Sequence, residues 1–304
     1  MRKKVIIITG PTAVGKTAAA IHVARHFQTE IISADSRQCF QEMSIGVARP
    51  SQVELQEIKH HFIASHSIHE NMSAGIFEQY ALRVADEIFQ RTDVVVVAGG
   101  TGLYVKAFVE GMDEIPVVDS SIRIHLIQEY ETNGKEWLQE ELKQRDPLYF
   151  SQGSMQNPQR MLRALEVLIG TGKSIISFQQ KNKKQRNFDI VSLSLDLPRE
   201  TLYARINARV DQMMDMGLWE EAQMLYPQRG LNALQTVGYK EIFDCIDGKH
   251  SIDEAVMLIK RNTRHFAKRQ CTWFTHQLPS QLFNAEEAKQ IIQFLESKFT
   301  SDCK

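Results

Sequence analysis

The stretch VIIITGPTAVGKT (residues 5–17) joins a short run of β-branched residues to a glycine-rich loop. The run, Val5–Thr9, ends at a glycine and is typical of a strand buried in a parallel sheet. The eight residues GPTAVGKT (Gly10–Thr17) fit the pattern G-x-x-x-x-G-K-[ST], and Ala18–Phe27 after them has the composition of a helix. This succession of strand, loop and helix predicts an α/β fold built around a phosphate-binding loop (P-loop).

The residue types of this loop indicate its chemistry. Its glycines let backbone N–H groups turn towards a phosphate, and the N-terminus of the following helix adds positive potential. Lys16 contributes a point charge, and the Thr17 hydroxyl is a suitable ligand for Mg²⁺. We therefore expect a ligand with a diphosphate or triphosphate to bind the whole loop: Gly10, Pro11, Thr12, Ala13, Val14, Gly15, Lys16 and Thr17.

Three further stretches have the length and composition of strands: Glu30–Ala34, Asp93–Ala98 and Asp189–Leu195. Between the first two, Ser73 is placed to cap a helix whose apolar residues recur at helical spacing. Strands that alternate with helices predict a doubly wound parallel sheet flanked by helices.

The stretch from Pro116 to Arg186 interrupts this alternation with helical periodicity, and it ends in the polar, basic segment KNKKQRN, Lys181–Asn187. Its periodic segments are Ile122–Tyr130, Trp137–Leu142 and Met161–Ile169. We therefore expect a P-loop core and a helical insertion domain, which comprise residues 1–115 with 187–304 and residues 116–186, respectively.

The C-terminal part of the core is predicted to be largely helical. Pro198 suits the first position of a helix that continues to about residue 226. Ser251 and Glu254 form a capping box before a long helix, and Asn284 with Glu287 repeat this pattern before the last helix.

The composition, with 43% hydrophobic and 24% charged residues, is that of an ordinary globular protein. A net charge of −1 means that only a local basic surface would attract a nucleic acid. The four cysteines (Cys39, Cys245, Cys271 and Cys303) lie far apart, which indicates neither a disulfide framework nor a zinc site. The apolar run Val5–Ile8 is too short for a signal sequence or a membrane span. We expect a cytoplasmic monomer in a reducing environment, without membrane association.

The P-loop does not by itself identify the phosphate compound. P-loop proteins that hydrolyse nucleoside triphosphates usually carry an Asp after an apolar strand to organise Mg²⁺. Here the apolar run Val94–Val97 is followed by Ala98-Gly99-Gly100-Thr101. This weakens the interpretation as a nucleoside triphosphate hydrolase and leaves a kinase open.

Asp35 follows the second predicted strand, within SADSRQ (Ser33–Gln38). A carboxylate at the carboxyl end of a parallel strand lies beside the crevice for phosphate ligands, where it can accept a proton from an attacking amine or hydroxyl. An Asp-Ser pair is also common as the cap of a turn. Both roles remain open from the spacing alone.

The late helix contains a candidate RNA-binding face. Arg261, Arg264 (or His265) and Lys268 lie at helical spacing, and no acidic residue interrupts Lys260–Thr275. A solvated charged face gives the same pattern. The aromatic residues Trp273 and Phe274 fit either an RNA-binding surface or a core.

Two other clusters favour structural roles. His60, His61 and His69 have no carboxylate at a metal-binding spacing, so we expect ordinary histidines. We assign the methionine-rich run Met213–Met216 to the core of a helix rather than to a cofactor site.

Six motifs follow one another along the chain: GPTAVGKT, ADSRQ (Ala34–Gln38), VAGGTGLY (Val97–Tyr104), RALE (Arg163–Glu166), VGYKE (Val237–Glu241) and AKRQCTWF (Ala267–Phe274). In this order they resemble the motifs of bacterial tRNA dimethylallyltransferases, from residue 4 to about residue 275. The P-loop is generic, whereas the ordered set is specific. One departure is Gln156-Asn157-Pro158, where that family often has His-Pro-Asn-Asp.

The resemblance implies a prenyltransferase that moves a dimethylallyl group from dimethylallyl diphosphate to N6 of adenosine 37, immediately 3′ of the anticodon of tRNA. The products are N6-dimethylallyladenosine and diphosphate. The donor would bind in the P-loop with Mg²⁺ at Thr17, and the adenosine would flip out of the anticodon stem-loop into the same channel. Asp35 matches the general base and Thr101 a threonine near the reaction centre, while Lys16 would stabilise the departing diphosphate.

The resemblance also implies which residues contact tRNA, some in the core and others in the insertion domain. These are Asp35, Ser36, Arg37, Gln38, Thr101, Arg123, Gln159, Arg160, Met161, Leu162 and Arg163.

Two alternatives to prenyl transfer are a nucleoside or small-molecule kinase that uses ATP and a P-loop regulatory or RNA-binding module without chemistry. The missing acid after Val94–Val97 favours prenyl transfer, because that reaction moves no γ-phosphoryl group. A kinase would consume ATP, and a binding module would turn over no diphosphate.

Overall fold

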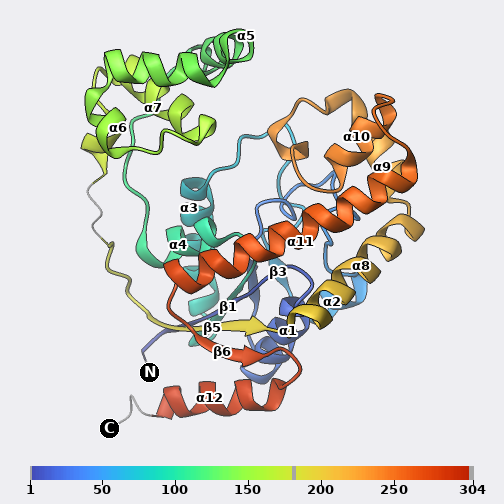
Figure 1. Ribbon diagram of the computed structural model, residues 1–304. Helices are drawn as coiled ribbons and strands as arrows, with labels where there is room; N and C mark the ends of the chain where they lie inside the picture. Colours follow the sequence, from blue (N-terminus) through green and yellow to red (C-terminus); the bar gives the residue numbers. More distant parts are fainter. Residues whose placement is uncertain (1, 180–182, 301–304) are drawn as a thin grey trace. The chain divides into compact units, whose positions relative to one another are not determined.

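The structure is a computed structural model that describes residues 2–179 and 183–300 (Figure 1). The chain divides into two compact units: Met1–Gly111 with Gln185–Lys304, and Met112–Lys184. We call the first the core and the second the insertion. Two residues of the predicted linker, Lys181 and Asn182, lie outside the described residues, as does Cys303.

The core contains a six-stranded parallel sheet in the order β3-β2-β4-β1-β5-β6. Its strands are β1 (Lys4–Thr9), β2 (Ile31–Ser33), β3 (His60–His61), β4 (Val94–Ala98), β5 (Asp189–Asp196) and β6 (Gln281–Asn284). On central β1, Val5 lies opposite Val95 of β4 and Ile190 of β5. All six residues of β1 are buried, as expected for a parallel strand with helices on both faces. The predicted α/β fold is confirmed.

Two strands of this sheet, β3 and β6, were not predicted from the sequence. The first pairs only Ile31 with His60 and Ile32 with His61. The second places Leu193 opposite Gln281 at the other edge. Both are too short to show a period of two residues, so only their pairing in the folded chain reveals them.

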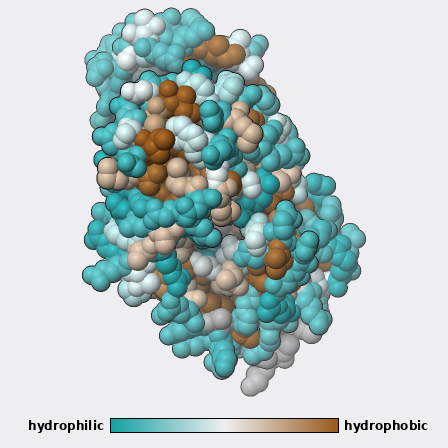
Figure 2. All heavy atoms as spheres, turned by 90° about the vertical axis from the view of Figure 1, so that its right-hand side faces the viewer, coloured by the Kyte–Doolittle hydropathy of each residue, from teal (hydrophilic) through white to brown (hydrophobic). Residues whose placement is uncertain are grey.

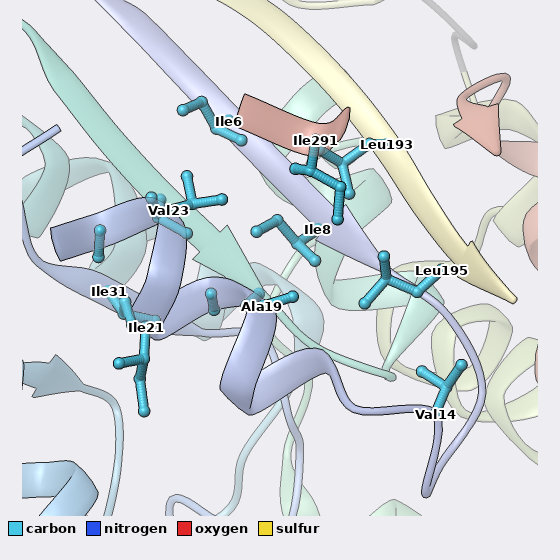
Figure 3. Close-up of a cluster of buried hydrophobic side chains, with 14 of the residues drawn as sticks. Ile6, Ile8, Val14, Ala19, Ile21, Val23, Ile31, Leu193, Leu195 and Ile291 are labelled. Atoms are coloured by element: carbon cyan, nitrogen blue, oxygen red, sulfur yellow. The ribbon is translucent and has the colours of Figure 1, made fainter. Parts of the chain in front are cut away.

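Side chains from β1, β2, β4, β5 and several helices form one hydrophobic layer of the core (Figure 3). Helices α1 (Lys16–His26) and α12 (Ala288–Thr300) contribute Ala19, Val23 and Ile291 to this layer, which Ile6 and Ile8 of β1 also join. Because strand side chains alternate, Val5 and Ile7 point to the opposite face.

Helices α3 (Ala74–Phe89) and α4 (Gly102–Glu110) pack against each other, and α3 also packs against β4. As predicted, Ser73 caps α3, because its side chain accepts a hydrogen bond from the Ile76 N–H at 3.2 Å. The short helix α2 (Gln52–Glu57) begins at a capping box formed by Ser51 and Glu54.

The rest of the core is helical: α8 (Arg199–Asp215), α9 (Leu218–Leu225), η2 (Tyr226–Gln228), η3 (Asn232–Leu234), α10 (Tyr239–Ile246) and α11 (Ile252–Gln277). Pro198 precedes α8 as its N-cap, and Gly217, with φ 97°, separates α8 from α9. The capping box of Ser251 and Glu254 is confirmed. The one predicted at Asn284 is wrong, because Asn284 ends β6 and its side chain accepts from the Glu286 N–H at 3.0 Å.

The insertion consists of α5 (Ser120–Arg145), α6 (Pro147–Gln152), α7 (Pro158–Thr171) and η1 (Ile175–Phe178). Gly134, with φ 79°, kinks α5. Residues of the three α-helices meet in a separate hydrophobic core that includes Leu126, Leu138, Tyr149 and Leu165.

Hydrophilic side chains cover most of the face shown in Figure 2, with patches of hydrophobic residues between them. Within the described ranges, none of the helices combines the length and the apolar composition of a membrane span.

Candidate active site

The P-loop turns sharply between β1 and α1. Gly10 and Gly15 have φ 143° and φ 108°, and Ala13 has φ 64°, which is rare for a residue with a side chain. A Cβ at Gly10 would lie 2.6 Å from the Leu195 carbonyl oxygen of β5, so only glycine fits there. The loop therefore brings its backbone closely against the sheet, as a phosphate cradle requires.

Lys16 lies inside this loop, where its Nζ donates a hydrogen bond to the Pro11 carbonyl oxygen at 2.7 Å. The pKa of Lys16 is lowered to about 8, mainly by burial and also by nearby Arg209, while Asp35 acts in the opposite direction. An anionic phosphate placed here would favour the charged form of Lys16.

Asp35 and Thr101 follow the carboxyl ends of the neighbouring strands β2 and β4. Asp35 Oδ1 accepts hydrogen bonds from the N–H groups of Arg37 (2.9 Å) and Gln38 (3.2 Å). In the described part of the chain, Asp35 Oδ2 has no hydrogen-bond partner. Asp35 therefore caps the turn with one oxygen and leaves the other for a ligand.

Thr101 joins this group through Ser36. Its Oγ1 accepts the Ser36 N–H at 3.0 Å and donates to Ser36 Oγ at 3.3 Å. A Cβ at Gly99 would lie 2.1 Å from the Ala34 carbonyl oxygen, so this glycine lets the two strand ends approach. The predicted catalytic residues Lys16, Asp35 and Thr101 thus lie together at one edge of the sheet.

Two cavities meet at these residues. The donor cavity, of about 530 Å³, contains Lys16 and Thr17 of the P-loop. The acceptor cavity, of about 710 Å³, contains Ser36, Arg37 and Thr101. Both are lined by Thr12, Asp35, Val47, Ala48, Arg209, Met213 and Phe266, so the two cavities adjoin, with Asp35 at their junction. We call the two cavities together the channel.

Arg209 and Gln270 belong to this channel but were not predicted from the sequence. Arg209 of α8 lines both cavities and lies close enough to lower the pKa of Lys16. Gln270 of α11 is buried, accepts the Thr12 N–H at 2.8 Å and donates to the Gly100 carbonyl oxygen at 2.9 Å. Its side chain therefore ties the P-loop to the turn that carries Thr101. Gln270 lies within the AKRQCTWF motif, which was the only available signal.

The basic residues of α11 lie in different surroundings. Arg261 and His265 line the acceptor cavity, as does Arg269. Lys268 lines a separate cavity of about 590 Å³ at the ends of β5 and β6. Arg264 donates to Asn207 Oδ1 at 2.7 Å.

Of the two aromatic residues that follow these basic residues on α11, Phe274 is buried and Trp273 is partly buried. A Cβ at Gly102 would lie 2.2 Å from the Trp273 ring. Both therefore have packing roles, so they do not strengthen the case for an RNA-binding surface on α11.

In the insertion, Glu166 organises three of the predicted RNA-contacting residues. It pairs with Arg123 at 3.0 Å and Arg163 at 2.6 Å, and Arg123 also donates to Gln159 Oε1 at 2.8 Å. Arg160 is exposed and forms no ion pair within the described residues.

Met161 and Leu162 are 0% and 1% exposed in the core of the insertion. Their side chains pack against protein, so we restrict the proposed RNA contacts of this segment to its polar residues. At the departure from the family motif, Asn157 caps α7 by accepting the Arg160 N–H at 3.2 Å, and Pro158 occupies its first turn.

His60 and His61 each have a structural partner, although the buried Nε2 of His60 forms no hydrogen bond within the described residues and His60 lines the donor cavity. His61 Nε2 lies 2.6 Å from Glu30 Oε2, and His60 Nδ1 lies 2.8 Å from the Ile58 carbonyl oxygen. In the part of the chain that the structure describes, no three His, Cys, Asp or Glu residues are grouped to hold a metal ion. The assignment of the methionine run to a helix core is wrong, because Met213 lines both cavities and Met216 is 59% exposed.

The P-loop faces one cavity, and a carboxylate lies where this cavity meets a second one. This arrangement is that of a P-loop enzyme that transfers a group from a phosphate-bearing donor to a second substrate. A family model described as IPP transferase matches residues 38–277. The chain belongs to this family of prenyltransferases, which confirms the resemblance inferred from the motifs.

Relatives of known name cover nearly the whole chain. The tRNA dimethylallyltransferase of Christiangramia forsetii is 49% identical over 99% of this chain and 100% of its own length. The tRNA dimethylallyltransferase 1 of Bacteroides fragilis is 41% identical over 97% of this chain and 98% of its own.

Two solved structures have the same fold. The full-length tRNA isopentenylpyrophosphate transferase of Bacillus halodurans gives a TM-score of 0.72 at 34% identity, covering 98% of this chain and 97% of its own. A eukaryotic dimethylallyltransferase acting on tRNA gives a TM-score of 0.83 at 25% identity, covering 99% of this chain and 80% of its own.

Proposed function

We propose that this protein transfers the dimethylallyl group of dimethylallyl diphosphate to N6 of adenosine 37 in tRNA, immediately 3′ of the anticodon, and releases diphosphate. The observation that carries this proposal is the channel in which a P-loop cavity meets a second cavity at Asp35. Membership of the IPP transferase family supports it independently.

The donor cavity is suited to a leaving diphosphate. In the reaction, the bond between C1 of the prenyl group and its diphosphate oxygen breaks, and the electron pair stays on that oxygen. The P-loop N–H groups, Lys16 and Arg209 meet the charge that develops there. Stabilisation that grows as the charge develops lowers the barrier rather than merely strengthening binding.

A divalent cation fits beside the same diphosphate. Thr17 lines the donor cavity and supplies a hydroxyl oxygen, and Mg²⁺ usually takes its remaining ligands from phosphates and water. We propose that Thr17 holds Mg²⁺, which when bound would neutralise charge on the diphosphate.

Asp35 is the proposed general base. The N6 amine of adenine is a weak nucleophile, because its lone pair is delocalised into the ring. As its nitrogen bonds to C1, the amine must lose a proton, and Asp35 Oδ2 is available at the junction of the cavities to accept it. Thr101 and Ser36 line the acceptor cavity beside it and would orient the nucleoside.

Several side chains that line the donor cavity supply an apolar environment for the prenyl group. Ile45, Val47, Met213 and Phe266 line the donor cavity next to the polar P-loop. Such side chains bind a five-carbon hydrocarbon and exclude water from its reactive carbon.

The acceptor is proposed to be the anticodon stem-loop of tRNA, with adenosine 37 flipped into the acceptor cavity. Arg37 and Gln38 lie beside Asp35, and Arg261 and Arg269 line the acceptor cavity, where they would meet phosphates. In the insertion, Arg123, Gln159, Arg160 and Arg163 are the proposed contacts. Because one chain lines the whole channel, we propose a monomer that acts on cytoplasmic tRNA.

The test is a transfer assay with unmodified tRNA and either labelled dimethylallyl diphosphate or ATP. We expect label in the RNA and release of diphosphate, with no transfer to a matched tRNA that carries guanosine at position 37. Formation of ADP would instead support the kinase, for which neither the site nor the relatives provide evidence. Absence of turnover with either donor would support a binding module.

A further inference from the structure

The segment between Asp35 and α2 forms no helix or strand, yet it lines both cavities. Ile45, Val47 and Ala48 face the donor cavity, and Gly46, Val47 and Ala48 face the acceptor cavity. We call residues 44–48 the channel wall. A wall without regular secondary structure needs other contacts to keep its shape, because it lacks the backbone ladder that fixes a strand.

Glu221 of α9 provides these contacts. Its buried carboxylate accepts the N–H groups of Ser44 at 3.0 Å and Ile45 at 2.8 Å through Oε2, and that of Gly46 at 2.9 Å through Oε1. Oε1 also accepts the Tyr239 hydroxyl at 2.6 Å. One carboxylate therefore binds three successive backbone amides, which fixes the path of the chain through them.

Tyr239, from the VGYKE motif, completes the arrangement. Its ring is fully buried, and a Cβ at Gly46 would lie 2.6 Å from it, so the wall approaches the ring as closely as glycine allows. Burial and the adjacent Glu221 carboxylate raise the pKa of Tyr239 far above its usual value, so its hydroxyl remains a donor.

The other side of the wall is tied to Asp35. Gln38 Nε2 donates to the carbonyl oxygens of Val47 at 3.2 Å and Ala48 at 2.9 Å, while the Gln38 N–H donates to Asp35 Oδ1 at 3.2 Å. The wall is thus held between the proposed base and the Glu221–Tyr239 pair.

We propose that Glu221 and Tyr239 are positioning residues for group transfer: they hold the channel wall at the junction of the cavities and thereby set the approach of the reacting atoms and the length of prenyl group accepted. This inference rests on the proposed function. Neither residue lines the donor cavity or contacts the P-loop, so both act through the wall.

The test compares Glu221→Gln, Tyr239→Phe and the control Glu220→Gln, which makes the same chemical change on the adjacent, exposed residue of α9. The Glu221→Gln substitution keeps the shape of the side chain and turns one acceptor into a donor facing the backbone N–H groups. We expect kcat with dimethylallyl diphosphate to fall by about 10–100-fold, because small displacements of reacting groups have effects of this size. The KM for tRNA should change less than kcat.

Donor length provides a readout that loss of fold would not alter. Relative to dimethylallyl diphosphate, use of the ten-carbon geranyl diphosphate should rise several-fold in Glu221→Gln and less in Tyr239→Phe, and stay unchanged in Glu220→Gln. Amide exchange of residues 44–46, measured without substrates, should accelerate in the same order. If Glu221→Gln does not fold, Tyr239→Phe, which removes one oxygen atom, carries the test.

Unchanged kcat, donor-length preference and amide exchange in a folded Glu221→Gln would overturn the proposal. A fall in kcat with wild-type donor preference and wild-type exchange would also overturn it, because the effect would then not pass through the wall. If the wild-type protein transfers no prenyl group, the proposed function fails separately.

Discussion

The core and the insertion hold their polar residues in different ways. In the core, Lys16, Asp35 and Thr101 follow the ends of parallel strands, and strand pairing such as that of Ser33 with Ala98 brings them together. In the insertion, Arg123 and Arg163 come from two helices and converge on the buried carboxylate of Glu166. Backbone geometry thus positions the proposed catalytic residues of the core, whereas ion pairs position the proposed RNA-binding arginines of the insertion. Substitutions of the proposed catalytic residues in the core should therefore change the rate of prenyl transfer. Substitutions of the arginines in the insertion should change the salt-dependent affinity for tRNA.

Asp35→Asn is expected to have the largest effect. The amide keeps the size of the side chain but cannot accept the amine proton, so the chemical step should slow by about 10²–10⁴-fold. Affinity for tRNA should stay near that of the wild type. Single-turnover transfer and equilibrium tRNA binding measure the two quantities. Lost binding with unchanged chemistry would make Asp35 a contact residue and would break the contrast between the units.

Lys16→Ala should follow, with a loss of about 10²–10³-fold in single-turnover rate, because one donor to developing charge disappears. The melting temperature should change little, because the wild-type protein gains no ion pair from Lys16 within the described residues. Lys16→Arg, which keeps the charge, is the matched control and should retain more activity. Near-normal turnover of Lys16→Ala would remove the P-loop from the chemistry.

Gln270→Leu should destabilise the core by about 1–3 kcal/mol, because the Thr12 N–H and the Gly100 carbonyl oxygen lose their common partner. Activity should also fall, since the P-loop and the Thr101 turn are then no longer tied together. Denaturant unfolding gives the free energy of unfolding, and transfer assays give the rate. Gln277→Leu, on the last turn of the same helix, is an exposed control. Equal stability of the Gln270 and Gln277 variants would contradict the bridging role.

Features fixed by a local sequence pattern could be predicted from the sequence, whereas features fixed by tertiary packing could not. The P-loop was predictable from its motif, and Asp35 from its position after a parallel strand, because the carboxyl ends of parallel strands lie side by side. Thr101 was predicted from the resemblance to the family. Arg209 and Gln270 were not, because tertiary packing decides which face of a helix points into a cavity. Helical periodicity outlined the insertion, and Arg163 with Glu166 are three residues apart on one helix. The pairing of Arg123 with Glu166 spans two helices and needed the structure.

The pH dependence of donor binding tests the electrostatic environment of the core site. With a pKa of about 8, Lys16 in the free protein loses its charge as the pH rises, whereas an unperturbed lysine would keep it to about 10.5. Affinity for a non-reactive diphosphate analogue should therefore fall above pH 8, by at most about tenfold per pH unit. The free energy of unfolding changes with pH in the opposite direction to this affinity. Between the folded-state pKa of about 8 and the unperturbed value of about 10.5, the unfolded chain binds more protons than the folded chain. Deprotonation of Lys16 therefore makes the folded state more stable as the pH rises. Calorimetric titration of the diphosphate analogue measures this affinity. It should fall above pH 8 in the wild type and stay constant with pH in Lys16→Arg.

The smallest effect is expected for salt-dependent tRNA binding, where the two units can be compared directly. Arg160 of the insertion has no ion-pair partner within the described residues, and Arg264 of α11 is bonded to the neutral Asn207, so both charges are uncompensated. If they neutralise phosphates, Arg160→Ala and Arg264→Ala should each flatten the slope of log affinity against log salt by about one unit or slightly less. Between 50 and 200 mM salt, that change corresponds to about three- to four-fold in affinity.

The insertion adds a change of opposite sign, because Glu166→Gln removes the negative charge between Arg123 and Arg163. Its slope should steepen by a similar amount, whereas Arg145→Ala, which breaks a surface pair with Glu141, is the control and should leave the slope unchanged. Arg160→Ala should also alter which anticodon loops are modified. Arg264→Ala should weaken the binding of all tRNAs alike, because contacts from the core are expected to bind the RNA backbone rather than to read its sequence. Unchanged slopes in Arg160→Ala and Arg264→Ala would identify both arginines as solvated surface charges, and the acceptor-cavity residues Arg261 and Arg269 would then be the remaining candidates for phosphate binding.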